Sequence, residues 1–226
     1  GMFISTLKDV PEIHCFEKDR LTGRILSSLY PKSKVNIEGF QSIQPYYNGY
    51  FDVVSSNIPF GNTRIYDRDF DRSDDPVRKS SLAAVHNYFF LKGLDAVRDG
   101  GIVAFITSQG VLDAPSNAPI REYMMNHANL VGVARLPNNL FTENAGTEVG
   151  SDLIILQKNS GKNGKLYYNE KLFVQTEQTP IGTSVNGYVW SIGSLSHTDL
   201  TKSTDPYGKP AYKLMHRGDT VQLAED

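Results

Sequence analysis

Short apolar runs alternate with segments whose apolar residues recur every three or four positions, and this alternation most constrains the fold. Strand-like runs occupy residues 12–19, 34–40 and 50–56, and they return in GIVAFITSQGVL, LVGVARLP and SDLIILQK. Helical spacing appears in RLTGRILSSLYP, SSLAAVHNYFFLKGLDAVRDGG and PIREYMMNHA. Such alternation predicts an α/β fold with a doubly wound, mostly parallel sheet. The last two strands have no helix between them, so we expect them to form a final antiparallel hairpin.

Two of these segments are informative in detail. Leu21, Ile25 and Leu29 recur at helical spacing, and Pro31 ends the predicted helix. Residues 50–56 have a continuous apolar centre, which is typical of a strand covered on both faces.

Residues 57–79 are polar and mix arginines with aspartates, so we expect a long, solvated and functional loop or a flexible insertion. The helix that follows has Ser80 or Ser81 as its predicted N-cap, and Gly100 is its predicted end.

The character of the chain changes after residue 158. NSGKNGK is rich in turn residues, KLYYNEKLFVQ and GYVWSIG are strand-like, and SLSHTDLTKSTDPYGKP resembles a loop. We therefore predict two parts: a main domain over residues 1–158 and a small β-rich extension over residues 159–226.

Composition excludes several classes of function. The 226 residues include 23 basic and 25 acidic ones, so bulk charge does not make the chain a basic nucleic-acid clamp. If it meets DNA, a local patch or another domain must supply the phosphate contacts. Cys15 is the single cysteine and the five histidines are scattered, so we expect no metal site. No apolar run approaches the ~20 residues of a membrane span, and no signal peptide is recognisable, so we expect a cytoplasmic protein.

The most informative motif is SNIPFG, at the end of the strand-like run 50–56. Ligands of open parallel sheets bind beyond the carboxyl ends of the strands. There, the amide oxygen of Asn57 and the backbone carbonyl of Ile58 can both accept hydrogen bonds. Pro59 stiffens the turn and Phe60 offers a flat apolar face. Together these residues suit a planar group that carries an NH₂.

Two acceptors aimed at such an amine would favour its pyramidal form and stabilise the positive charge that develops as the nitrogen attacks a methyl sulfonium. Near-linear positioning would supply much of the remaining acceleration. The cationic product can lose its proton afterwards, so no acidic general base is required.

SNIPFG resembles the Asn-Pro-Pro-Phe/Tyr motif of S-adenosylmethionine-dependent N6-adenine DNA methyltransferases, with Ile58 in place of the first proline. RLPNNLF…AGTEVGSDLIILQK is similar to an element of type I restriction methylase subunits and of helicase-methylase modules from mobile elements. HNYFFLKGLDAVRDGGIVAFITSQGVLD and FEKDRLTGRILSSLYP also resemble segments of that family. The resemblance covers residues 2–158.

The resemblance implies S-adenosylmethionine as cofactor, DNA as partner, no metal, and a role for each matching residue. Asn57 and Ile58 would hold the target amine, and Phe60 would stack on a flipped adenine. Glu17 would bind the cofactor ribose, or is an ordinary acid at a strand end. Phe141 would contact the base, or is a core aromatic.

Two further cofactor residues carry a departure from the family pattern. Gln41 falls near the place where the family often has an acid facing the cofactor's adenine. The family holds its cofactor on a glycine-rich turn of the Phe-x-Gly-x-Gly kind, and no such turn is recognisable before residue 12. Gly1 matches only the far end of that turn, and it resembles a residue left by cleavage of a tag.

We therefore expect a chain that lacks the first strand of the sheet and is weak or inactive in isolation. Some repair of the resulting gap is expected, because unpaired backbone groups are costly. The strand of residues 12–19 could close onto that of residues 50–56, or a strand of the extension or of another protomer could be borrowed.

Two alternatives to adenine methylation stay open. One is a methyltransferase for another planar nitrogen, such as a glutamine amide or an RNA base. The other is a non-catalytic remnant that serves as an interaction or DNA-docking module.

Overall fold

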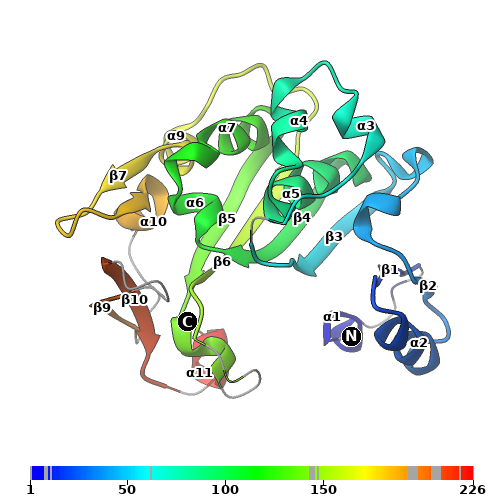
Figure 1. Ribbon diagram of the computed structural model, residues 1–226, viewed down its shortest axis with the longest axis horizontal. Coiled ribbons are helices and arrows are strands. Elements are labelled where there is room, and N and C mark those ends of the chain that lie inside the picture. The colour runs from blue at the N-terminus through cyan, green and yellow to red at the C-terminus, as the bar shows by residue number, and fades with distance from the viewer. Residues whose placement is uncertain are drawn as a thin grey trace.

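The computed structural model describes residues 2–7, 10, 12–61, 63–142, 146, 148–192, 198–204, 210–218 and 220–225. Its centre is a four-stranded sheet with helices packed against it, and smaller elements lie at either end (Figure 1). Gly1 lies outside the described residues, so its predicted role has no structural counterpart here.

The central sheet has the strand order β3-β4-β6-β5. Its strands are β3 (Phe51–Asn57), β4 (Val97–Ser108), β5 (Ala128–Leu136) and β6 (Ser151–Lys158). β3 and β4 run parallel, whereas β6 is antiparallel to both β4 and β5. The predicted antiparallel pairing of the last two strands is confirmed. The expectation of a mostly parallel sheet is wrong for the described strands, because the two pairs that involve β6 are antiparallel and the sheet is mixed.

Helices cover one face of this sheet (Figure 1). They include α3 (Arg68–Asp71), α4 (Pro76–Ser81), α5 (Val85–Ala96), α6 (Gly110–Asp113) and α7 (Ala118–His127). The core between helices and sheet contains fully buried aromatic and aliphatic side chains such as Phe90, Phe105 and Ile154. The expectation that residues 50–56 are covered on both faces is wrong, because the Val53 side chain is 57% exposed.

The boundaries of α5 also differ from the prediction. Ser81 belongs to α4, where its hydroxyl donates to the Arg78 carbonyl, and Ala84 occupies the N-cap of α5. The helix ends at Ala96 instead of Gly100, because the chain passes directly into a long β4.

The N-terminal elements lie beside β3, at the opposite end of the molecule from the C-terminal hairpin (Figure 1). They are α1 (Met2–Thr6), β1 (His14–Phe16), α2 (Arg20–Leu29) and β2 (Lys34–Asn36), with short 3-10 turns at Phe40–Ser42 and Pro45–Tyr47. β1 and β2 pair in parallel as a separate sheet.

Within the described residues, neither the strand of residues 12–19 nor a strand of the extension pairs with the outer edge of β3. Side chains join the two sheets at one end instead. Tyr50 donates to Glu12 at 2.8 Å, and the His14 ring packs edge-on against Phe51. An aromatic cluster therefore holds β1 near the start of β3 without main-chain pairing.

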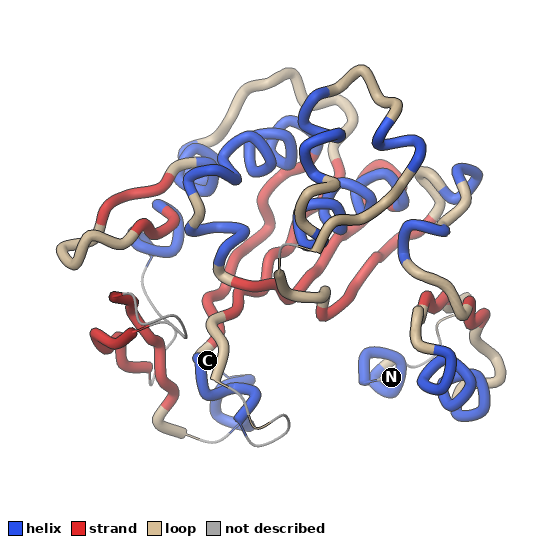
Figure 2. The backbone as a smooth tube through the Cα atoms, in the orientation of Figure 1, coloured by secondary structure: helices blue, strands red, loops and turns tan. Residues whose placement is uncertain are grey.

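The chain after residue 158 mixes helices and strands (Figure 2). It contains α9 (Tyr168–Val174), β7 (Thr176–Gln178), β8 (Ser184–Asn186), α10 (Gly187–Ile192), β9 (Thr198–Thr204), β10 (Pro210–His216) and α11 (Thr220–Glu225). Two predicted strands are thus wrong, since they form α9 and α10, and the expected loop contains β9. Phe173 of α9 is fully buried in the main core. The division of the chain at residue 158 stays a prediction.

Candidate active site

The motif Asn57–Phe60 begins where β3 ends at the carboxyl edge of the sheet. Asn57 is the last residue of β3, and it pairs with Ile106 of β4. Ile58 is 2% exposed and belongs to the core, whereas Asn57 and Pro59 are exposed and Phe60 is half-buried. The buried Ile58 therefore anchors the motif, with the exposed Asn57 amide before it and the half-buried Phe60 ring two positions after it.

The backbone of Ile58 explains how isoleucine is accommodated in this motif. Its N–H donates to the Ile106 carbonyl at 3.0 Å, a bond that proline in the same place could not make. No hydrogen bond from another described residue reaches the Ile58 carbonyl or the Asn57 side chain. The two predicted acceptors are therefore available to a ligand.

The segment after Phe60 turns at Gly61, which has φ +116°, a backbone conformation that favours glycine. The imidazole of His86, at the start of α5, is buried, and burial lowers its pKa.

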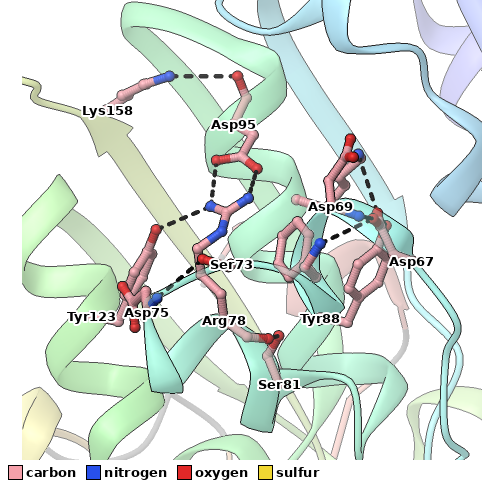
Figure 3. Close-up of polar contacts among 12 residues, drawn as sticks. Asp67, Asp69, Ser73, Asp75, Arg78, Ser81, Tyr88, Asp95, Tyr123 and Lys158 are labelled. Carbon is pink, nitrogen blue, oxygen red and sulfur yellow. Dashed lines mark hydrogen bonds and ion pairs between the residues drawn. The ribbon is translucent and has the colours of Figure 1, made fainter.

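Asp67 is the main anchor of the same segment (Figure 3). One carboxylate oxygen accepts from the N–H groups of Asp69 and Phe70 at the start of α3, at 2.9 and 3.2 Å. The other accepts from the Tyr88 hydroxyl at 2.6 Å and from Lys92 Nζ at 3.3 Å. Burial opposes ionisation of Asp67, but these two donors hold its pKa below the ordinary value.

Arg78 forms a second anchor between α4, α5 and α7 (Figure 3). Its guanidinium makes a bidentate pair with Asp95 at 2.9 and 2.7 Å and donates to the Tyr123 hydroxyl at 3.2 Å. It also lies 4.0 Å above the Phe70 ring. The expectation of a fully solvated loop is therefore wrong: Phe70 is completely buried, and two charged networks fix this segment to the helices.

The predicted cofactor residues lie on the N-terminal elements. Glu17 directly follows β1; one of its oxygens accepts from the Asp19 N–H at 2.9 Å. Gln41 is half-buried in the first 3-10 turn, next to Phe40, whose ring stacks on Phe89 of α5. In the described part of the chain, no hydrogen bond or ring contact links Glu17 or Gln41 to the motif of β3.

Phe141 is half-buried at the end of the 3-10 turn η4 (Asn138–Phe141), which follows β5. The C-terminal strand β10 is bound to this turn. Asn138 accepts from the Leu214 N–H at 2.9 Å, and Asn139 both accepts from and donates to the His216 backbone, at 3.0 and 3.1 Å. Residues of the extension thus hold the turn that carries Phe141.

Sequence reasoning missed the buried charges behind this edge. Arg135 of β5 pairs with the fully buried Asp152 of β6 at 2.8 Å and with Asp113 of α6 at 2.9 Å. Although burial opposes its charge, the two carboxylates raise the pKa of Arg135. The N-caps Asp67 of α3 and Asp75 of α4 do have a sequence signal: each is an aspartate before a helix, and Pro76 follows Asp75 at the first helical position.

The described residues contain no group of three or more histidine, cysteine or acidic side chains that could hold a metal ion. None of the helices among them is long and apolar enough to cross a membrane.

Comparison with known proteins gives a family. The sequence model that describes the N-6 DNA methylase family matches residues 26–184, which is more than half of the chain. No curated protein sequence matches the chain.

The fold is similar to that of solved methyltransferases. A class I S-adenosylmethionine-dependent methyltransferase from Listeria monocytogenes is 18% identical, with a TM-score of 0.55, and the match covers 74% of this chain and 50% of that one. A type I restriction modification subunit from Vibrio vulnificus is 14% identical, with a TM-score of 0.55 and coverages of 81% and 50%. The M protein of the type I restriction enzyme EcoKI is 17% identical, with a TM-score of 0.52 and coverages of 68% and 32%. The chain thus spans half or less of the length of these proteins.

Proposed function

The chain belongs to the N-6 DNA methylase family, and from this premise we propose that its sheet edge transfers a methyl group from S-adenosylmethionine to the exocyclic amine of an adenine in DNA. The observation that carries the proposal is the pair of unused acceptors at the end of β3. Asn57 is exposed there, and Ile58 is anchored through its N–H to β4, which leaves its carbonyl available.

In this proposal, the adenine leaves the base stack so that its amine can reach the motif. The amine donates its two hydrogens to the Asn57 amide oxygen and the Ile58 carbonyl, which directs its lone pair out of the ring system. Phe60 packs against the face of the base. Because both acceptors sit on a rigid strand end, they stabilise the developing positive charge without reorganising. The methylated amine then loses one proton to solvent.

S-adenosylmethionine supplies a methyl group on a positively charged sulfur, and the described residues offer part of a site for it. Glu17 ends β1 with one carboxylate oxygen bonded to the Asp19 N–H and a second oxygen to which no described residue donates. A carboxylate of this kind suits the ribose hydroxyls. Gln41 would lie on the adenine side of the cofactor.

Substitution of Asn57 tests the proposal. The chain is incubated in excess over an adenine-containing duplex with tritiated S-adenosylmethionine, and methyl transfer is followed in a single turnover. We expect Asn57→Ala to lower the rate by about 100-fold or more, since one preorganised acceptor is lost. Asn48→Ala, an exposed asparagine in the turn before β3, serves as the matched control and should keep the wild-type rate.

Three outcomes would contradict the proposal. The first is an Asn57→Ala variant that methylates as fast as the control. The second is transfer to an RNA or to a glutamine-containing peptide but not to DNA, which would favour another planar nitrogen as substrate. The third is a wild-type chain that transfers no methyl group even in prolonged incubation, which allows for the weak activity expected of the isolated chain; this result would favour a non-catalytic module.

A further inference from the structure

The segment that follows the motif presents its side chains alternately inward and outward. Ile65 donates its N–H to the Leu82 carbonyl at 2.9 Å and is half-buried, and Asp67 is buried. Arg64, Tyr66 and Arg68 point the other way: all three are exposed, and Tyr66 is 77% exposed. This alternation is typical of an extended segment that is anchored along one side.

The anchoring also determines which charges are paired. Asp67, the acid between the two arginines, accepts hydrogen bonds from Tyr88, Lys92 and two backbone N–H groups. Neither Arg64 nor Arg68 forms an ion pair with another described residue. The stretch from Arg64 to Arg68 therefore offers two guanidinium groups without a carboxylate partner, with a phenol between them, and the exposed acids Asp69 and Asp71 follow on α3.

We propose that Arg64, Tyr66 and Arg68 bind the sugar–phosphate backbone of DNA next to the target base. The proposal rests on the proposed function, which makes DNA the ligand of the neighbouring motif. Arginine and tyrosine are both common donors to phosphate oxygens, and such contacts position a protein on DNA without reading its sequence. This contact supplies the local patch that a chain of net charge −2 needs in order to hold DNA.

The spacing along the chain fits this role. Arg64 lies four positions after Phe60, so their Cα atoms are at most about 14 Å apart. The same upper limit applies to the distance between the Cα atoms of Arg64 and Arg68. One DNA strand carries a phosphate about every 3.4 Å along the helix axis. The two arginines can therefore reach different phosphates on the strand that holds the target nucleotide.

Rigidity favours the same interpretation. The anchors at Ile65 and Asp67 fix the backbone on both sides of Tyr66, so little main-chain freedom is lost when a ligand binds. Preorganised donors bind more tightly than the same donors on a flexible loop.

The test is the salt dependence of DNA binding, measured by fluorescence anisotropy with a labelled duplex and no cofactor. The double variant R64Q/R68Q should bind roughly tenfold or more weakly in 0.1 M salt, and the slope of log Kd against log salt should become shallower by about 1.8, as expected for two lost phosphate contacts. The matched control is R20Q/R24Q on α2, which changes the net charge equally and also removes two exposed arginines four positions apart. It should keep the wild-type slope.

Equal slopes for the wild type and R64Q/R68Q would overturn the proposal, as would an equal loss in the control. A wild-type chain that binds no DNA, or that prefers RNA of the same sequence, would overturn it too. The variant Asn57→Ala separates the two proposals. If Asn57→Ala loses methyl transfer while R64Q/R68Q binds DNA normally, the proposed phosphate contact is refuted and the proposed function is retained.

Discussion

The helices α2 and α5 were both predicted from apolar residues at helical spacing, but they have very different surroundings. On α5, Tyr88, Phe90 and Leu91 are at most 1% exposed, because the helix packs between the central sheet and α4 and α7. On α2, the apolar stripe of Leu21, Ile25 and Leu29 is 69, 51 and 66% exposed. The spacing predicted the helix correctly, but no described residue covers this stripe.

The contact that α2 does make lies on its other side. Gly23 and Leu26 are its buried residues, and Gly23 approaches Ile37 so closely that an added Cβ would lie 2.9 Å from the Ile37 side chain. A two-stranded sheet offers only this small surface, whereas the four-stranded sheet together with α4 and α7 covers α5 on nearly all sides. Periodicity thus identifies an apolar face, but the element that covers it depends on contacts far away in the sequence.

The substitution with the largest expected effect on stability is Phe90→Ala on α5. Phe90 is fully buried and packs edge-on against Phe105 of β4, so truncation leaves a cavity between helix and sheet. We expect a loss of about 3–5 kcal/mol in the free energy of unfolding. Chemical denaturation measures it, and a loss below about 1 kcal/mol would mean that α5 is not packed as described.

The buried charges beside α5 give the next largest effect. Asp67→Asn keeps the shape of the side chain but leaves Lys92, which is 4% exposed, without its carboxylate. We expect a loss of about 3 kcal/mol, because an uncompensated buried charge is costly. The double variant with Lys92→Met should recover part of that loss, and full additivity of the two changes would contradict the ion pair.

The same carboxylate makes stability depend on pH. The pKa of Asp67 is lower in the folded chain than its ordinary value of 3.8, so its contribution is fully present above that value. It is lost as the pH falls through the lower folded pKa. Unfolding measured between pH 7 and pH 2 should therefore show a steeper acid loss for the wild type than for Asp67→Asn, and identical profiles would contradict the lowered pKa.

Sequence predicted the central strands well, because their apolar runs are long and unambiguous. It failed where a few polar contacts decide the structure. KLYYNEKLFVQ has the composition of a strand, yet Glu170 accepts from the Tyr167 N–H at 2.9 Å and starts α9. Likewise, Asn186 accepts from the Tyr188 N–H at 3.1 Å at the start of α10.

The candidate site was predictable to a similar degree. Asn57 lies at the end of a parallel strand, as the motif indicated, and the role of each motif residue stays a prediction. The inward turn of Asp67 and the outward turn of Arg64 and Arg68 could not be predicted. Both depend on Tyr88 and Lys92 of α5, more than 20 positions away, so a stretch of mixed charge looked uniformly solvated.

The smallest expected effect comes from α2. Leu29→Ala removes a side chain that is already two-thirds exposed, so little apolar surface returns to water and no cavity forms. We expect a change within about 0.5 kcal/mol in the free energy of unfolding. Leu26→Ala, on the same helix but only 8% exposed, is the matched control and should cost about 2 kcal/mol. If Leu29→Ala costs as much as Leu26→Ala, the stripe is covered in solution, and the difference between α2 and α5 disappears.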